Sequence, residues 1–238
     1  MNGKTAFRIS DSTRVKRRSA ISMAATNSRR WKQAAGIWGL VAMGLCLAGC
    51  SFLKPAHGTA RRFLLTPLPS SAMPTTNGGT RPPLSVGVGQ VKMPAYLLDS
   101  SIAVRKGTNE IDYLTTALWA EQLDNGFQRV LAANLSVLLP TDRIRLTAWR
   151  PEDVSVEVYA SVEQFDVNTE GSGVLIAWWR IRSAGGDKTF KSGETRLVRQ
   201  GPTPAADLPG ATATLSELVA EMSRQLAQAI NETVPIVR

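Results

Sequence analysis

The feature that most constrains the fold of this chain is a period-two alternation of apolar and polar residues in "VSVEVYASVE" (154–163). Valine or alanine stands at each even position, and serine, glutamate or tyrosine stands at each odd position. Successive side chains of a strand point to opposite faces, so the pattern predicts an antiparallel strand with one buried face and one solvated face. The turn sequences "EGSG" (170–173) and "AGGD" (184–187) predict two further strands, over 174–183 and 188–199.

Shorter strands are predicted before this region. Alternating valines indicate a strand over 84–91, which Pro94 ends because proline has no backbone N–H to donate. The turn "KGTN" (106–109) joins strands over 102–105 and 110–113 into a hairpin. One more short strand is predicted over 143–149.

The first of two predicted helices covers 116–137. Apolar residues recur there every three or four positions, starting at Trp119, which is typical of one buried helix face. We interpret Trp119 as an anchor of this helix and Glu121 as a surface or capping carboxylate. A ligand site at these two residues is the alternative.

The second predicted helix closes the chain. Its apolar face runs from Leu215 to Ile230, and Thr214 with Glu217 matches a capping box at its start. The predicted fold class is therefore α+β: a mostly antiparallel sheet covered by two amphipathic helices.

The first 49 residues have the composition of a secretory signal. They hold nine Lys and Arg residues and one acidic residue, and the run at 34–47 is uncharged and largely apolar. This run is shorter than the roughly 20 residues that cross a bilayer, which favours a signal peptide over a permanent transmembrane helix. "LAGC" (47–50) resembles the bacterial lipobox, whose cysteine is acylated and becomes the first mature residue. We predict a covalent lipid, such as palmitate, on Cys50 and no other cofactor.

The chain is thus predicted to have three parts. Residues 1–49 form the signal, and Met23 is a hypothetical true start because it opens a segment with an ordinary signal layout. Residues 50–83 form the lipidated N-terminus and a proline-rich tether, in which "FLL" (63–65) is able to pair as an edge strand. Residues 84–238 form one domain.

Charge argues against nucleic acid as a partner. The whole chain has 28 Lys and Arg residues and 19 Asp and Glu residues, a formal charge of +9. Residues 1–49 account for +8 of this charge, so the chain from Cys50 onwards carries 19 basic and 18 acidic residues, about +1. No basic stripe of the kind that binds nucleic acid remains.

The residue pattern contains no catalytic or metal-binding set. Two cysteines and one histidine, His57, are too few for a four-ligand metal site. "VGVG" (86–89) lacks the third glycine of a dinucleotide-binding loop, and we interpret it as close approach inside a sheet. We therefore expect no enzyme and no metal.

Trp178 and Trp179 form the candidate contact site. Adjacent strand residues face opposite ways, so one indole is predicted to enter the core and the other to face outward. A wholly structural role is one interpretation, and contact of the outward indole with a protein or lipid is the other.

Three stretches carry a family resemblance: "RRFLLTPLP", "VGVGQVKMPAYLLDSSIAVRKGTNEIDY" and "LWAEQLDNGFQRVLAANL". With "ELVAEMSRQLAQAI" near the C-terminus, they resemble the ABC-type transport auxiliary lipoprotein family, the PqiC/YmbA type, over about 63–230. Phe63 stands where tyrosine is more usual in this family.

The resemblance implies a function without a catalytic residue. It implies an outer-membrane lipoprotein that works with a periplasmic MCE-domain protein and, indirectly, with an inner-membrane permease and its ATPase. Such systems move phospholipid or other apolar molecules between the two membranes and support envelope integrity. The lipid anchor would hold the chain on the periplasmic face of the outer membrane, and Ser51 is consistent with this because an aspartate there retains lipoproteins in the inner membrane.

Other readings of the sequence stay open. One alternative is a periplasmic lipoprotein that carries a lipid or other apolar ligand in its own pocket, and another is an enzyme with a dispersed site. A homo-oligomer is compatible with the sequence. The transported molecule and the direction of transport do not follow from it.

Overall fold

A computed structural model describes residues 60–70, 84–146 and 148–233. The chain divides into two compact units, 1–56 and 57–238, and every described residue lies in the second unit. The predicted signal, Met23, Cys50, Ser51 and His57 lie outside the described residues.

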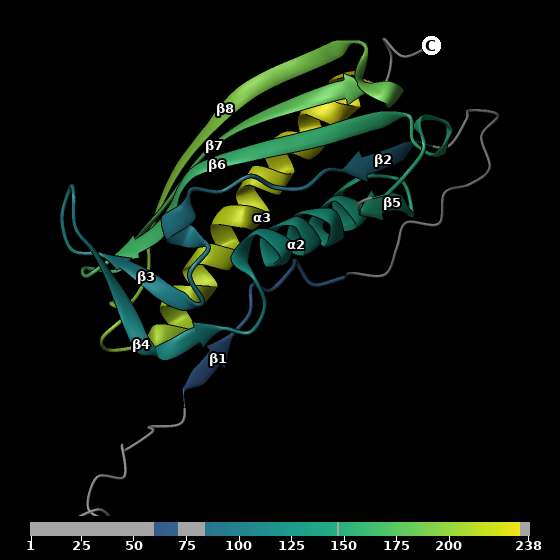
Figure 1. The fold of residues 1–238 in the computed structure, drawn as a ribbon. Coiled ribbons are helices and arrows are strands. Elements are labelled where there is room, and N and C mark those ends of the chain that lie inside the picture. The colour runs from purple at the N-terminus through teal and green to yellow at the C-terminus, as the bar shows by residue number, and fades with distance from the viewer. Residues whose placement is uncertain (1–59, 71–83, 147, 234–238) are drawn as a thin grey trace, which may run out of the picture. The chain divides into compact units, whose positions relative to one another are not determined.

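The described residues form an α+β fold, as predicted from the sequence (Figure 1). Their single sheet has eight strands. The bounds are β1 (Arg61–Phe63), β2 (Ser85–Val88), β3 (Ser101–Arg105), β4 (Ile111–Trp119), β5 (Arg143–Leu146), β6 (Val156–Asn168), β7 (Ser172–Ser183) and β8 (Thr189–Gln200). The two long helices are α2 (Leu123–Leu138) and α3 (Leu208–Thr233), and the short 3-10 turns are η2 (Ala95–Leu97), η3 (Pro151–Asp153) and η4 (Ala184–Gly186).

The sheet is mixed in direction. β3 with β4, β6 with β7, and β7 with β8 pair antiparallel, and the last two pairs run along the whole of their strands. β1 with β4, β2 with β5, β2 with β6, and β3 with β6 pair parallel over two to four residues. The long pairs are therefore the antiparallel ones that the sequence predicted.

Strand β6 organises the sheet. One edge pairs with β7 along its length, while the other edge is shared by β2 near its start and β3 at its end. The predicted alternation is confirmed, because Val156, Val158, Ala160 and Val162 are buried. The register shifts between Val162 and Gln164, and this bulge moves the buried side from even to odd positions. As a result, Phe165 and Val167 also face the core.

Both helices pack on one face of the sheet and on each other, and their apolar side chains fill the core. Phe127 of α2 and Phe165 of β6 meet edge to face, with ring centroids 5.3 Å apart. Leu131 and Leu135 of α2, with Leu226 of α3, are also fully buried.

The predicted start of the first helix is wrong. Residues 116–119 belong to β4, and α2 begins at Leu123. The backbone N–H of Trp119 donates to the carbonyl of Ser100 at 2.7 Å, so strand pairing overrides the local helical spacing. Trp119 is buried at the end of a strand and does not anchor the helix.

The predicted capping box of the second helix is also wrong. Thr214 lies inside α3, where its hydroxyl donates to the carbonyl of Gly210 four residues earlier. The helix begins at Leu208, and Asp207 caps it by accepting the backbone N–H of Gly210 at 3.0 Å. Pro209 lies in the first turn of the helix, where its missing N–H costs nothing.

The described part of the predicted tether contacts the domain. β1 pairs in parallel with β4, which confirms an edge strand in this segment but two residues earlier than "FLL". Leu65 is buried, and the carbonyl of Leu65 accepts the guanidinium of Arg129 at 3.1 Å. The backbone N–H of Leu68 donates to Oδ1 of Asn134 at 2.7 Å. Residues 61–68 therefore pack on β4 and α2.

Candidate functional site

The two tryptophans of β7 face opposite sides of the sheet, as predicted. Trp179 is 8% exposed and points toward α3, where its Nε1 donates to Oγ1 of Thr195 at 3.1 Å. That hydroxyl donates in turn to Gln225 of α3 at 2.7 Å. Trp178 is 50% exposed on the opposite side, and its Nε1 donates to Glu163 at 2.8 Å. We call this opposite side of β6, β7 and β8 the outer face.

One end of the outer face is apolar. Val174 and Ile176 of β7 are half-buried there, and Val198 of β8, which pairs with Val174, is 68% exposed. Trp178 follows on the same side of β7, because side chains two residues apart share a face. The outer face thus begins with a row of partly exposed apolar side chains on β7, beside Gln164 of β6 and Arg196 of β8.

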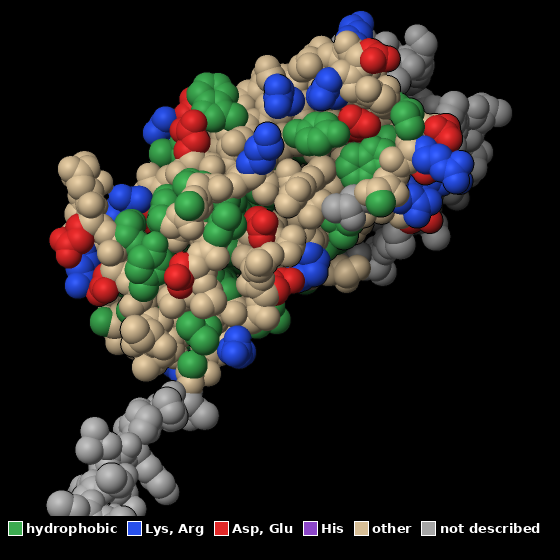
Figure 2. Space-filling view, viewed as in Figure 1, with side chains coloured by type: hydrophobic (Ala, Val, Ile, Leu, Met, Phe, Trp, Pro, Cys, Tyr) green, Lys and Arg blue, Asp and Glu red, His purple; other side chains and the backbone are tan. Residues whose placement is uncertain are grey.

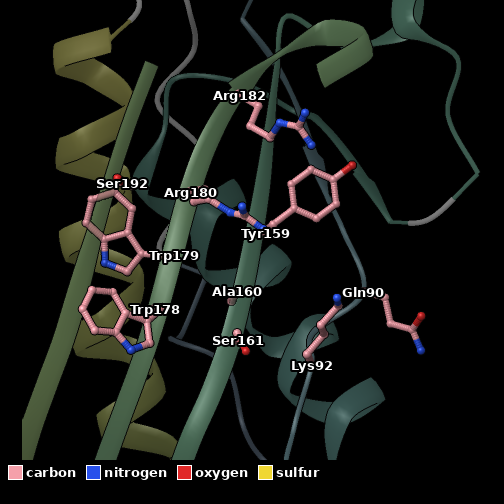
Figure 3. Close-up of a pocket in the computed structure, with 10 residues that line it drawn as sticks. All are labelled: Gln90, Lys92, Tyr159, Ala160, Ser161, Trp178, Trp179, Arg180, Arg182 and Ser192. Carbon is pink, nitrogen blue, oxygen red and sulfur yellow. The ribbon is translucent and has the colours of Figure 1, made fainter. Parts of the chain in front are cut away.

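The other end of the outer face is a basic groove of about 550 Å³. Its lining includes Lys92, Tyr159, Trp178, Arg180 and Arg182 (Figure 3). Three neighbouring segments supply these side chains: the segment after β2, β6 and β7. Lys92 pairs with Ser161 of β6, and Ser161 and Tyr159 of β6 pair with Trp178 and Arg180 of β7. In Figure 3, Arg180 extends from β7 toward β6, and Arg182 lies beside the Tyr159 ring. Figure 2 shows basic and hydrophobic side chains close together over this part of the sheet.

The cations of the basic groove lack acidic partners. Its lining contains no Asp or Glu, and no ion pair in the described part of the chain involves Lys92, Arg180 or Arg182. The guanidinium of Arg182 lies 5.9 Å from the Tyr159 ring centroid, and one of its nitrogens donates to the carbonyl of Gly186. Its Nε is buried with no hydrogen-bond acceptor among the described residues.

The carboxylates around the groove are bound to other donors. Glu157 accepts the indole N–H of Trp149 at 3.1 Å and the hydroxyl of Tyr159 at 3.2 Å. Glu163 accepts the indole N–H of Trp178, and Glu194 forms an ion pair with Arg196 at 2.7 Å. Burial, and then the charge of Glu157, raise the pKa of Tyr159, so its hydroxyl stays a neutral donor. The lining of the groove is therefore basic, and Glu157 and Glu163 at its edge, whose donors are neutral N–H and O–H groups, form no ion pair with its cations.

Two buried glycines, Gly87 in β2 and Gly89 just after it, lie against aromatic rings. A Cβ at Gly87 would lie 2.6 Å from the Trp149 ring, and a Cβ at Gly89 would lie 2.5 Å from the Tyr159 ring. The predicted close approach at "VGVG" is confirmed, but aromatic rings approach the glycines rather than another backbone. Glycine is needed here because any larger residue would displace a ring.

A buried charge network at the other end of β6, where Asp166 pairs with Val174, is structural. Asp166 is 2% exposed and accepts Arg105 at 2.7 Å and the hydroxyl of Tyr96 at 3.0 Å. Burial, and then the charge of Asp166, raise the pKa of Tyr96 to about 12. Since every polar atom here has a partner, the network fixes the β2–β3 connection on β6.

The position of Glu121 fits one of the predicted roles. Its carboxylate pairs with Arg129 at 2.5 Å, just before α2 begins. Because Arg129 also donates to the carbonyl of Leu65, Glu121 helps hold the N-terminal segment. No group of His, Cys, Asp and Glu side chains in the described ranges is arranged to bind a metal ion.

Comparison with known families assigns the chain. The family model described as "ABC-type transport auxiliary lipoprotein component" matches residues 63–227. The chain belongs to this family. The family consists of transport auxiliary lipoproteins and is not a family of enzymes, as expected from the sequence. Its members associate with ABC transport systems as lipoproteins of the cell envelope.

Two solved structures share the fold of this auxiliary lipoprotein. An uncharacterised protein is 19% identical with a TM-score of 0.57, covering 72% of this chain and 99% of its own. Protein XCC0632 from Xanthomonas campestris is 12% identical with a TM-score of 0.55, covering 71% of this chain and 93% of its own. At these identities the likeness shows the fold alone. A comparison with curated proteins gives no match.

The sequence analysis found the tryptophan pair but missed the basic groove. Arg180 and Arg182 follow Trp178 at intervals of two, which places all three on one face of a strand. That signal was present in the sequence. The contribution of Lys92 depends on pairing between the segment after β2 and the middle of β6, which no local pattern encodes. Neither helix among the described residues has the length and hydropathy of a membrane span.

Proposed function

We propose that this protein is the outer-membrane subunit of an ABC-type transport system whose periplasmic component contains MCE domains. Its acylated Cys50 holds it on the periplasmic face of the outer membrane, and its domain docks the far end of the periplasmic component. The system moves phospholipid or another apolar molecule between the two membranes, which supports envelope integrity. The permease and ATPase of the inner membrane act on this subunit only through the periplasmic component.

The family match over residues 63–227 carries this proposal. An auxiliary lipoprotein without its own transport or catalytic machinery acts through the proteins it contacts. The lipobox before Cys50 supplies the means of attachment, and Ser51 lacks the charge of an aspartate retention signal. Each acyl chain contributes about 0.8 kcal/mol per buried CH₂, and two or more chains anchor a protein stably.

The packed N-terminal segment sets the distance between anchor and domain. Arg61 already pairs with β4, and it follows Cys50 by eleven positions. A chain of that length extends to at most roughly 40 Å. The domain therefore stays close to the outer membrane, and the periplasmic component must reach it there.

The filled core favours docking over carriage of a lipid inside this domain. The large side chains between the sheet and the helices are fully buried, including Phe127, Leu131 and Leu226. The exposed Trp178 and its neighbours on the outer face instead offer a contact surface. Aromatic residues give large contact area for little lost entropy and are enriched at interfaces.

The test is co-purification from native membranes. The tagged, lipidated chain should recover the MCE-domain subunit, and Trp178→Ala should weaken the association about 10- to 150-fold because a central interface tryptophan contributes roughly 1.5–3 kcal/mol. Leu98→Ala is a matched control, since Leu98 is an apolar residue of similar exposure (47%) that lies after η2 and outside β6, β7 and β8. Recovery of phospholipid from the purified domain, without any MCE-domain subunit, would instead support a lipid carrier.

A further inference from the structure

We infer that the basic groove docks an acidic surface of the periplasmic subunit, while the apolar end of the outer face packs against apolar side chains beside it. This inference rests on the proposed docking function and adds the chemistry of the partner surface. It assigns Lys92, Arg180 and Arg182 to the charged half of the interface and Trp178 to the boundary between the halves.

The first argument is the uncompensated charge. The groove lining presents three cations and no carboxylate, and no ion pair among the described residues joins these cations to Glu157 or Glu163. Lys92 and Arg180 are exposed, and no hydrogen bond or ion pair ties their side chains within the described structure. Like charges held together repel one another, so an acidic partner surface would relieve this repulsion as it binds.

The second argument is the spacing of the cations. Arg180 and Arg182 are two residues apart on β7, about 7 Å along the strand. Lys92 comes from a different element, on the far side of β6 from Trp178. A single phosphate group would contact only part of this set. An extended acidic surface, with carboxylates at several positions, is able to contact all three.

The third argument is the mixture of residue types. Trp178, Tyr159, Arg180 and Arg182 lie together in one depression. Tryptophan, tyrosine and arginine are the residues most enriched among those that dominate protein–protein binding energy.

The fourth argument is the change from apolar to basic side chains along the outer face. Along β7, apolar side chains at Val174, Ile176 and Trp178 give way to the cations at Arg180 and Arg182. An interface with apolar contacts at one end and ionic contacts at the other can be engaged in one orientation only, because the reverse orientation buries charge against apolar groups. The outer face therefore also sets the orientation of the docked subunit.

The test measures affinity between the full lipidated chain and the purified MCE-domain subunit in one detergent, at low and high salt. Arg180→Glu with Lys92→Glu should weaken binding about 100-fold at low salt and abolish most of the salt dependence. Trp178→Ala should weaken binding at both salt concentrations and leave the salt dependence unchanged. Arg143→Glu with Arg145→Glu is the matched control, because these two arginines are exposed on β5, outside the outer face, and the charge change is the same.

The outcomes separate this inference from the docking proposal. If the wild-type chain does not bind the subunit at all, the docking proposal fails. If it binds, and the double variant binds equally well with the same salt dependence, docking stands and the acidic-partner inference is refuted. Arg180→Lys should retain binding, which guards against misfolding as the cause of a loss. Groove-dependent binding of phosphatidylglycerol vesicles or inorganic phosphate, with subunit affinity unchanged in the double variant, would also refute it.

Discussion

Replacing Asn134 with alanine tests whether the N-terminal segment is part of the folded domain. The Asn134 side chain is fully buried in α2, accepts the backbone N–H of Leu68 at 2.7 Å and donates to Ser223 of α3 at 3.0 Å. This one amide therefore joins the anchor-proximal segment to both helices.

The magnitude follows from these contacts. Each lost hydrogen bond costs about 0.5–1.5 kcal/mol, and the small cavity left by the amide adds about 1 kcal/mol. The hydroxyl of Ser223 still donates to the carbonyl of Val219, so it is not left unpaired. The free energy of unfolding of Asn134→Ala should fall by about 2–4 kcal/mol, which lowers the Tm of a domain of this size by about 4–16 °C.

Two assays check the prediction. Calorimetry on Asn134→Ala gives the Tm, and hydrogen exchange at the Leu68 amide reports whether the segment detaches locally. Asn125→Ala is the control, because Asn125 is exposed on the same helix and bonds only near the helix start. An unchanged Tm with unchanged protection of the Leu68 amide would refute the reasoning.

Three further predictions address the sheet and the anchor. Gly89→Ala should destabilise the domain by about 1–3 kcal/mol by pushing on the Tyr159 ring, whereas Gly107→Ala, with nothing within 4 Å, should not; urea unfolding of both variants decides this. The pKa of Tyr96 is raised to about 12 in the folded state, so the folded state keeps this proton where the unfolded state loses it. The stability that this raised pKa of Tyr96 contributes is present below pH 10 and is lost as the pH rises toward 12. In the same urea assay, the free energy of unfolding of Tyr96→Phe should therefore fall less at alkaline pH than that of the wild type. Cys50→Ala should abolish metabolic labelling with a palmitate analogue, and labelling equal to wild type would rule out this cysteine as the acylation site.

The long strands were predictable because their pattern is local and strong. Alternation over 154–163 and turn residues on either side define β6, β7 and β8 without reference to the rest of the chain. The same alternation predicted that Trp178 and Trp179 face opposite sides. Only the bulge after Val162 was missed, since it depends on how β6 pairs with β7.

The errors arose where distant pairing decided the outcome. Trp119 has the correct spacing to belong to α2, yet pairing with Ser100 keeps it in β4. At α3, the capping-box pattern of Thr214 and Glu217 lies inside the helix, whose true cap is Asp207. The basic groove was not predicted for the same reason. Lys92 lines it only because the segment after β2 pairs with Ser161 of β6.

The position of the periplasmic subunit after membrane fractionation tests the central claim most directly. Membranes from cells with the wild-type chain and from cells with Cys50→Ala would be separated on a density gradient, and the MCE-domain subunit would be followed with an antibody. We predict that part of the subunit travels with outer-membrane fractions in the wild type and that it is confined to inner-membrane fractions in Cys50→Ala. The same distribution in both strains would contradict docking by this lipoprotein.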